Sequence, residues 1–126
     1  MRCLAGETTM KYMLMFYETP AAFTDRETAA AGAYWAGWTA YVQALNAAGI
    51  VAGGQGLQPP ASATTVRVQG GTRQVQDGPF ANTKEQLGGF FIIDVPNLDD
   101  ALAWAARAPC AETAGVEVRP VLLPMA

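Results

Sequence analysis

Histidine is absent from this 126-residue chain, and cysteine occurs only twice, at Cys3 and Cys110. Without histidine, the chain cannot assemble a Ser-His-Asp or Cys-His nucleophile system or the common imidazole sites for metal ions. The GGQG run at residues 53–56 lacks the third glycine and the following helix of a dinucleotide fingerprint, and no Walker-type phosphate loop occurs. We therefore expect a protein that holds no metal ion and no cofactor.

Charged residues are also scarce, at 15% of the chain, and the net charge is -3. The basic residues are scattered from Arg2 to Arg119, so they form no positive stripe that would neutralise a phosphate backbone. No apolar run approaches the length of about 20 residues that a membrane-spanning helix needs. We expect a soluble protein that has neither nucleic acid nor membrane as a partner.

The first nine residues, MRCLAGETT, lack an apolar period and contain no signal-peptide core. We expect residues 1–9 to be a flexible leader and residues 10–126 to form one domain. Because Cys3 lies in that leader, a disulfide with Cys110 is not expected, and a reducing cytoplasm is the simplest location.

Two segments, residues 11–17 and 90–93, are apolar on both alternating faces, as strands are when both sides are covered. Shorter strands are predicted within residues 50–58 and 116–119. The run TTVRVQGGTRQVQDG predicts a hairpin that turns at residues 70–71. In the register that follows, the pairs are Gln69 with Thr72, Val66 with Val75 and Thr64 with Asp77, so one face carries Val66, Val68, Val75 and Asp77.

Two helices are predicted between these strands. The first begins at Thr24, which has capping-box spacing with Glu27, and ends at Gly49. Because Gly32 and Gly37 each cost about 1 kcal/mol relative to alanine, its first turns are expected to fray or bend, which leaves its start open. The second is capped by Asn97 and extends to Arg107. The core-facing stripes are Tyr34, Trp35, Trp38, Tyr41, Val42 and Leu45 in the first helix, and Leu98, Ala101, Leu102 and Ala105 in the second. The alternative interpretation of Tyr34, Trp35, Trp38 and Tyr41 is an aromatic binding box, and helix core is favoured over it.

This order of elements predicts an α+β fold of the ferredoxin-like, split βαβ type, with a mostly antiparallel sheet and two helices on one face. Two helices cover only one side of the sheet. Since two strands are apolar on both faces, we expect a second sheet to close the open face, and a second copy in a homodimer is its simplest source.

Four segments, MKYMLMFY, LQPPASATTVRV, DGPFANTKEQLGGFFIIDVPNLDDALAWAAR and VEVRPV, resemble the YCII-related family in its DGPF-motif subgroup, and the match extends from Met10 to Val121. The resemblance implies a dimeric α+β barrel. That superfamily includes small-molecule isomerases, dehydrochlorinase-like enzymes and cofactor-free monooxygenases, and some members occur beside transcription-related domains. The histidine and aspartate pair proposed for related YCII proteins cannot operate in a chain without histidine.

The stretch DGPFANTKEQLGGF, residues 77–90, is either a structural corner or part of a site. Asp77 precedes Gly78, an ordinary turn pair in which the carboxylate accepts backbone N–H bonds. On the apolar side of the hairpin, Asp77 would also have a raised pKa and would abstract a proton from a substrate. Both roles are compatible with the sequence.

Other candidate site residues lie near or after this corner. Glu85 is a second candidate acid or base, and Lys84 would attract an anionic substrate, although Asn82 capping a short turn explains both without a ligand. Phe80 would contact the substrate. Arg119 either pairs with Glu117 on a sheet edge or faces into a pocket between sheets.

Two classes of function follow from these residues. The first is a small cofactor-free enzyme that uses Asp77 or Glu85 for proton transfer, and Arg119 or Lys84 to hold a small acidic or aromatic molecule. The second is a non-catalytic, ligand-binding or regulatory module that uses the same pocket.

Overall fold

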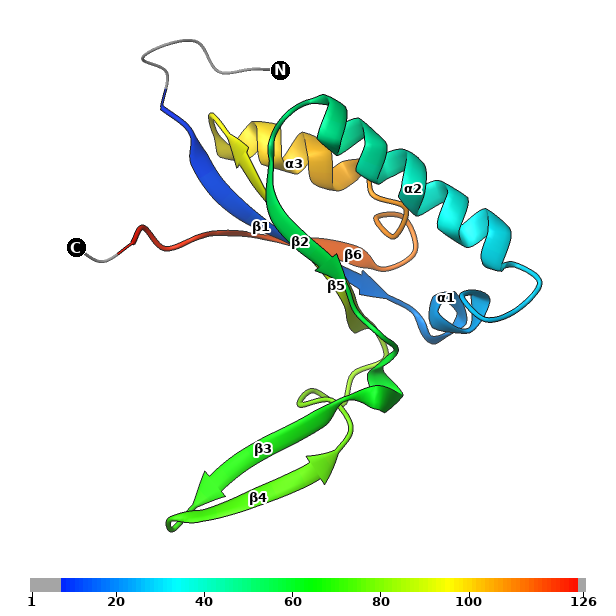
Figure 1. The fold of residues 1–126 in the computed structure, drawn as a ribbon, viewed down its shortest axis with the longest axis vertical. Helices are drawn as coiled ribbons and strands as arrows, with labels where there is room; N and C mark the ends of the chain where they lie inside the picture. The colour runs from blue at the N-terminus through cyan, green and yellow to red at the C-terminus, as the bar shows by residue number, and fades with distance from the viewer. Residues whose placement is uncertain (1–7, 125–126) are drawn as a thin grey trace.

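A computed structural model describes residues 8–124 of the chain (Figure 1). The strands are β1 (Met10–Glu18), β2 (Val51–Gly56), β3 (Thr64–Gln69), β4 (Thr72–Asp77), β5 (Gln86–Val95) and β6 (Gly115–Pro120), and the helices are α1 (Pro20–Asp25), α2 (Ala31–Ala47) and α3 (Leu98–Ala106), with a 3-10 turn, η1 (Pro60–Ser62). Most of the expected leader, residues 1–7, lies outside the described residues. Within residues 8–124, no helix is long and apolar enough to cross a membrane.

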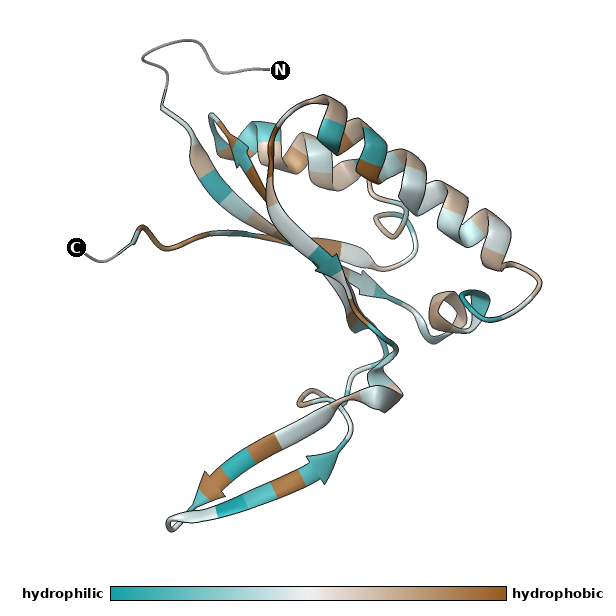
Figure 2. Ribbon diagram, in the orientation of Figure 1, coloured by the Kyte–Doolittle hydropathy of each residue, from teal (hydrophilic) through white to brown (hydrophobic). Residues whose placement is uncertain are grey.

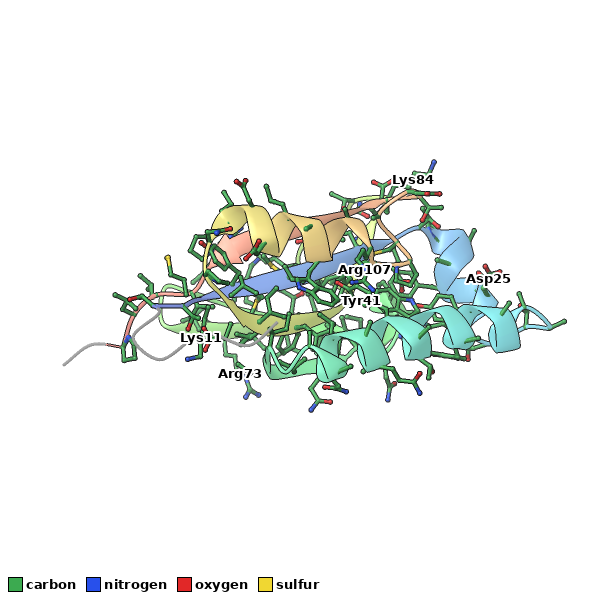
Figure 3. All side chains as sticks on the ribbon, turned by 90° about the horizontal axis from the view of Figure 1, so that it is seen from above. Lys11, Asp25, Tyr41, Arg73, Lys84 and Arg107 are labelled. Atoms are coloured by element: carbon green, nitrogen blue, oxygen red, sulfur yellow. The ribbon has the colours of Figure 1, made fainter. Side chains whose placement is uncertain are left out.

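Four strands form an antiparallel sheet in the order β2-β5-β1-β6. Helices α2 and α3 lie side by side over one face of this sheet, as Figures 1 and 3 show from two directions. This arrangement confirms the predicted α+β, ferredoxin-like fold.

The core lies between the sheet and the two long helices. Leu14 on β1, Leu45 on α2 and Ile93 on β5 are fully buried, and Ala101 and Ala105 bring α3 close to the sheet. Alternation along β1 explains this arrangement, since every second residue of a strand points to the same face. The buried residues of β1 are Tyr12, Leu14, Phe16 and Glu18.

The predicted single helix from Thr24 to Gly49 is wrong at its start. The structure has two helices there, and the cap of α1 is Thr19, whose hydroxyl oxygen accepts a hydrogen bond from the Ala22 N–H at 3.2 Å. A threonine followed by Pro20 is a strong helix start, because proline suits the first turn. The helical end at Gly49 is confirmed by its positive φ of 71°.

The other helix prediction is confirmed at its cap, where the Asn97 side chain accepts a hydrogen bond from the Asp100 N–H at 2.9 Å. Its predicted apolar stripe is correct only in part. Ala101 and Ala105 are buried, whereas Leu98 and Leu102 are each 46% exposed. The short alanine side chains pack on the sheet, and the leucines lie outside that contact.

The hairpin has the predicted register, with Gln69 opposite Thr72, Val66 opposite Val75 and Thr64 opposite Asp77. However, β3 and β4 form a separate two-stranded sheet that projects away from the main one (Figures 1 and 2). Its apolar side chains are exposed, at 57% for Val66, 67% for Val68 and 57% for Val75. The hairpin is therefore an insertion between two strands of the ferredoxin-like sheet.

Candidate functional site

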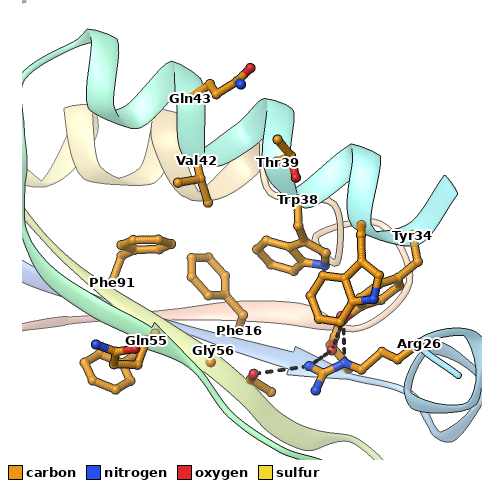
Figure 4. A pocket seen from close by; sticks show the side chains of 15 residues that line it. Phe16, Arg26, Tyr34, Trp38, Thr39, Val42, Gln43, Gln55, Gly56 and Phe91 are labelled. Carbon is orange, nitrogen blue, oxygen red and sulfur yellow. Dashed lines mark hydrogen bonds and ion pairs between the residues drawn. The ribbon is translucent and has the colours of Figure 1, made fainter. Parts of the chain in front are cut away.

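A pocket of about 320 Å³ opens between α2 and the strands β2 and β5 (Figure 4). Its walls are mainly aromatic. Phe16 contacts both Trp38 and Phe91 edge to face, with ring centroids 5.0 and 6.0 Å apart. The volume is at the lower end of the range of roughly 300 to 1,000 Å³ that is usual for ligand pockets, so the space suits a small molecule.

One end of the pocket holds a buried ion pair between Glu18 and Arg26. Arg26 Nη2 lies 2.9 Å from Glu18 Oε1, and the side chains are only 9% and 3% exposed, respectively. Glu18 ends β1 on the core face, and Arg26 immediately follows α1, so the break between α1 and α2 brings the two charges together. Burying either charge alone would be costly, which makes each dependent on the other.

Tyr34, in the first turn of α2, completes this cluster. Its hydroxyl lies 2.6 and 2.7 Å from the two Glu18 carboxylate oxygens, and it accepts a hydrogen bond of 3.0 Å from Arg26 Nε. Burial, followed by the hydrogen bond to Glu18, raises the pKa of Tyr34 to about 12. At neutral pH the phenol is therefore protonated and donates to the carboxylate.

The remaining contacts of Arg26 hold it rigidly. Nη1 donates to the Leu57 carbonyl at 2.6 Å, and Nη2 donates to the Gly88 carbonyl at 3.2 Å. The guanidinium also lies against the rings of Phe23 and Trp35, 4.8 and 5.4 Å from their centroids. The cluster thus ties together β1, α2, β5 and the segment after β2.

Gly88 leaves the space that this cluster occupies. A Cβ at position 88 would lie 2.6 Å from Glu18 Oε1 and 3.0 Å from Arg26 Nη2. At Gly89, a Cβ would lie 3.0 Å from the carbonyl oxygen of Gln55 on the neighbouring strand. The two glycines that precede Phe90 therefore line the pocket.

The model of the YCII-related domain matches residues 10–124. The chain belongs to the YCII-related family. A stretch of 69 residues, 53% of this chain, is 48% identical to the uncharacterized protein R00369 of Rhizobium meliloti (strain 1021) and covers 56% of that protein. The match thus spans just over half of the length of that relative.

The corner at Asp77 of this YCII-related chain is held by backbone groups. Gly78 N–H donates to the Ala63 carbonyl at 2.8 Å, and the Thr65 hydroxyl donates to the Gly78 carbonyl at 2.8 Å. Within residues 8–124, the exposed Asp77 carboxylate makes no hydrogen bond. The predicted corner exists, but the predicted carboxylate bonds to backbone N–H groups are not what holds it.

The loop after this corner is exposed, including Lys84 and Glu85. Gln86, rather than Asn82, orders the loop, since its Nε2 donates to the carbonyls of Ala81 and Thr83 at 2.8 Å each. Phe80 is 73% exposed, and its ring lies under the Arg67 guanidinium, 4.8 Å from the centroid. Asp77, Phe80 and Arg67 line one shallow hollow at the base of the hairpin.

Arg119 lies on β6, an edge strand of the main sheet, and pairs with Glu117 through an Nε to Oε2 distance of 3.0 Å. The register places these two residues opposite Met13 and Met15, on the face away from the helices. Neither the pocket beneath α2 nor the hollow at the base of the hairpin is lined by Arg119. The structure therefore brings Asp77 together with Phe80 but not with Arg119.

Sequence reasoning missed the cluster of Glu18, Arg26 and Tyr34. One signal was available, because Glu18 continues the alternation of Phe16 and Leu14 and thus places an acid on the core face. Arg26 had no such signal, since its position depends on the helix break. Within residues 8–124, no three histidine, cysteine, aspartate or glutamate side chains are grouped as a metal site would require.

Proposed function

We propose that this YCII-related protein binds a small, largely apolar molecule in the pocket beneath α2 and acts on it by acid–base chemistry without a cofactor. The observation that carries the proposal is the Glu18 carboxylate, which lines an aromatic pocket and is held by Arg26 and Tyr34. A charged group in an apolar pocket interacts strongly with a bound molecule, because little water screens it.

In this proposal Glu18 accepts a proton from an acidic C–H or O–H group of the ligand. Arg26 and Tyr34 position the carboxylate. The Arg26 guanidinium donates one hydrogen bond to it, and the Tyr34 hydroxyl donates another that keeps the carboxylate oriented. A base acts only when it lies within hydrogen-bond reach of the proton that it removes. The pocket wall formed by Phe16, Trp38 and Phe91 would hold the ligand against Glu18.

We further propose that the protein acts as a homodimer whose two sheets face each other. Support comes from the open face of the sheet, where Met13 and Met15 of β1 lie beside Phe90 and Ile92 of β5. We also assign the chain to the DGPF-motif subgroup, because residues 77–80 carry that motif.

The roles predicted from the sequence for the corner and β6 remain proposals. Asp77 and Glu85 would be acid–base groups, and Lys84, Arg119 and Phe80 would contact a substrate. They would form a second site only if a second copy brought β6 to the base of the hairpin.

Hydrogen exchange in a bound ligand tests the acid–base proposal. Small ketones with enolisable C–H groups that raise the melting temperature would be incubated with the protein in D2O, and NMR would follow the loss of their acidic C–H signals. We expect the protein to accelerate this exchange, and Glu18→Gln to abolish the acceleration while the ligand still binds. Tyr34→Phe retains the carboxylate but removes the hydroxyl that positions it, so it should slow the exchange without abolishing it.

The alternative function is a non-catalytic, ligand-binding or regulatory module. One observation favours it, namely that Tyr34 engages both oxygens of Glu18 while Arg26 engages one of them. Ligands that bind in the pocket but show no accelerated exchange would support this alternative and contradict the enzyme.

A further inference from the structure

The polar end of the pocket carries no net charge. Among the described residues that line it, only Glu18 and Arg26 are charged, and they form an ion pair with each other. Tyr34 adds a hydroxyl that is neutral at neutral pH. From this balance we infer that the ligand is an uncharged aromatic molecule and that anionic ligands are disfavoured, an inference that rests on the proposed ligand-binding function of this pocket.

The hydrogen bonds of Arg26 support this selectivity. The guanidinium donates to Tyr34, Leu57, Glu18 and Gly88, which leaves a single N–H of the donors that a guanidinium carries. A bidentate pair with a carboxylate or phosphate needs two parallel N–H groups. Arg26 therefore cannot hold an anionic ligand in this way without giving up a bond that it already makes.

Glu18 acts against an anion as well. A ligand carboxylate placed at this end of the pocket would approach a like charge in a region with little water, and no other cation lines the pocket in residues 8–124 to offset the repulsion. An uncharged ligand has no such cost. Its removal from water is favourable, since Phe16, Trp38 and Phe91 provide apolar contact area.

The polar side chains elsewhere on the walls are also uncharged. Thr39 and Gln43 are exposed side chains of α2 at the edge of the pocket, whereas Gln55 of β2 is paired with Phe90, so its side chain lies on the open face of the sheet. Hydroxyl and amide groups both donate and accept hydrogen bonds, so they suit a carbonyl, amide or hydroxyl substituent. The ligand class indicated is thus a small aromatic ketone, amide or phenol rather than an aromatic acid.

Matched pairs of ligands test this inference. Benzamide and benzoate, and 2-naphthamide and 2-naphthoate, have nearly the same shape but differ by one charge at pH 7. Titration calorimetry, with quenching of tryptophan fluorescence as a second readout, would give the dissociation constants. We expect at least one amide to bind at least tenfold more tightly than its carboxylate.

Variants that change the charge of the pocket provide a second test of the inference. Thr39→Lys adds a cation at an exposed position on the pocket wall, and it should improve carboxylate binding at least fivefold relative to the amide. Glu18→Gln should shift the preference in the same direction by leaving Arg26 unbalanced. Thr39→Gln is the control, because it adds length without charge and should leave the preference unchanged.

The outcomes separate the two proposals. Carboxylates that bind as tightly as their amides, or a preference that Thr39→Lys does not move, would overturn the inference while leaving a ligand site in the pocket. Binding by no member of either pair, or binding that Trp38→Ala and Thr39→Lys both leave unchanged, would instead remove the pocket as the site and overturn the proposed function with it.

Discussion

At the scale of single residues, the buried pair of Glu18 and Arg26 is the feature on which the pocket depends. Its partners come from separate parts of the chain, including Tyr34 at the start of α2 and the carbonyls of Leu57 and Gly88. Such a pair contributes little net stability compared with apolar residues of the same size, yet removing one partner leaves an uncompensated buried charge.

Arg26→Met should therefore destabilise the protein by about 3–5 kcal/mol, because Glu18 loses its counter-charge while it remains buried. Urea denaturation would measure the loss. The double variant Glu18→Gln with Arg26→Met should lose clearly less than the sum of the two single losses, since it removes both charges together. A loss of under about 1 kcal/mol for Arg26→Met would contradict this account of the cluster.

The raised pKa of Tyr34 predicts a dependence of stability on alkaline pH. Because the folded state holds the proton of Tyr34 more tightly, its contribution is complete below pH 10 and is lost as the pH rises from 10.0 toward the folded-state pKa of about 12. Wild type should thus lose stability more steeply over this window than Tyr34→Phe. Melting temperatures measured from pH 8 upward would compare the slopes, and equal slopes would count against the prediction. Tyr41, whose pKa burial also raises, is common to both proteins.

At Asp77 the structure changes the expected effect of mutation. The sequence predicted that the Asp77 carboxylate accepts hydrogen bonds from backbone N–H groups, but the exposed carboxylate makes no hydrogen bond within residues 8–124. We now expect Asp77→Ala to change stability by less than about 0.5 kcal/mol. Gly78→Ala should cost about 1–2 kcal/mol, because Gly78 has a φ of 104°. Denaturation of the two variants would separate the contribution of the Asp77 side chain from that of the Gly78 backbone conformation. A larger loss of stability for Asp77→Ala would show that the carboxylate does hold the turn.

At the scale of elements, patterns among neighbouring residues predicted where α3 and the hairpin lie along the chain. The cap of α3 is a bond between the Asn97 side chain and the Asp100 N–H, both within one turn. The two glycines of the β3–β4 turn have the positive φ angles, 56° and 78°, that such a turn requires. Both features involve residues close in sequence, which is why they were predictable.

Asn97→Ala should lower the stability by about 1 kcal/mol, because the Asp100 N–H loses its acceptor. Asn97→Ser should retain most of the stability, since a serine hydroxyl also caps a helix. Thermal denaturation followed by circular dichroism would measure both variants. Equal losses would show that the cap is not the source of the effect.

At the scale of the whole molecule, the sheet has one face covered by α2 and α3 and one face that no element within residues 8–124 covers. The projecting hairpin likewise exposes its valines. Apolar side chains on surfaces that no helix covers are typical of interaction sites, and under the homodimer proposal a second copy of the chain would supply the matching surface.

The homodimer proposal predicts a dimer at micromolar concentration in sedimentation or light scattering. Met15→Glu, on the open face opposite Glu117, should shift the protein to monomer by placing like charges in the interface. Leu102→Glu is the matched control, because Leu102 is 46% exposed on α3 and should not affect assembly. A wild-type monomer would refute the proposal.

The sequence by itself determined what depends on short-range pattern: the strands, the Asn97 cap, the hairpin register and, through their order, the ferredoxin-like fold. These features follow from alternation, capping and turn chemistry, which act between residues a few positions apart. The tertiary structure alone decided that Arg26 meets Glu18, Tyr34 and Gly88 across the fold. Those contacts rest on how α1, α2 and β5 pack together, so no local pattern could disclose the ion pair at the end of the pocket beneath α2.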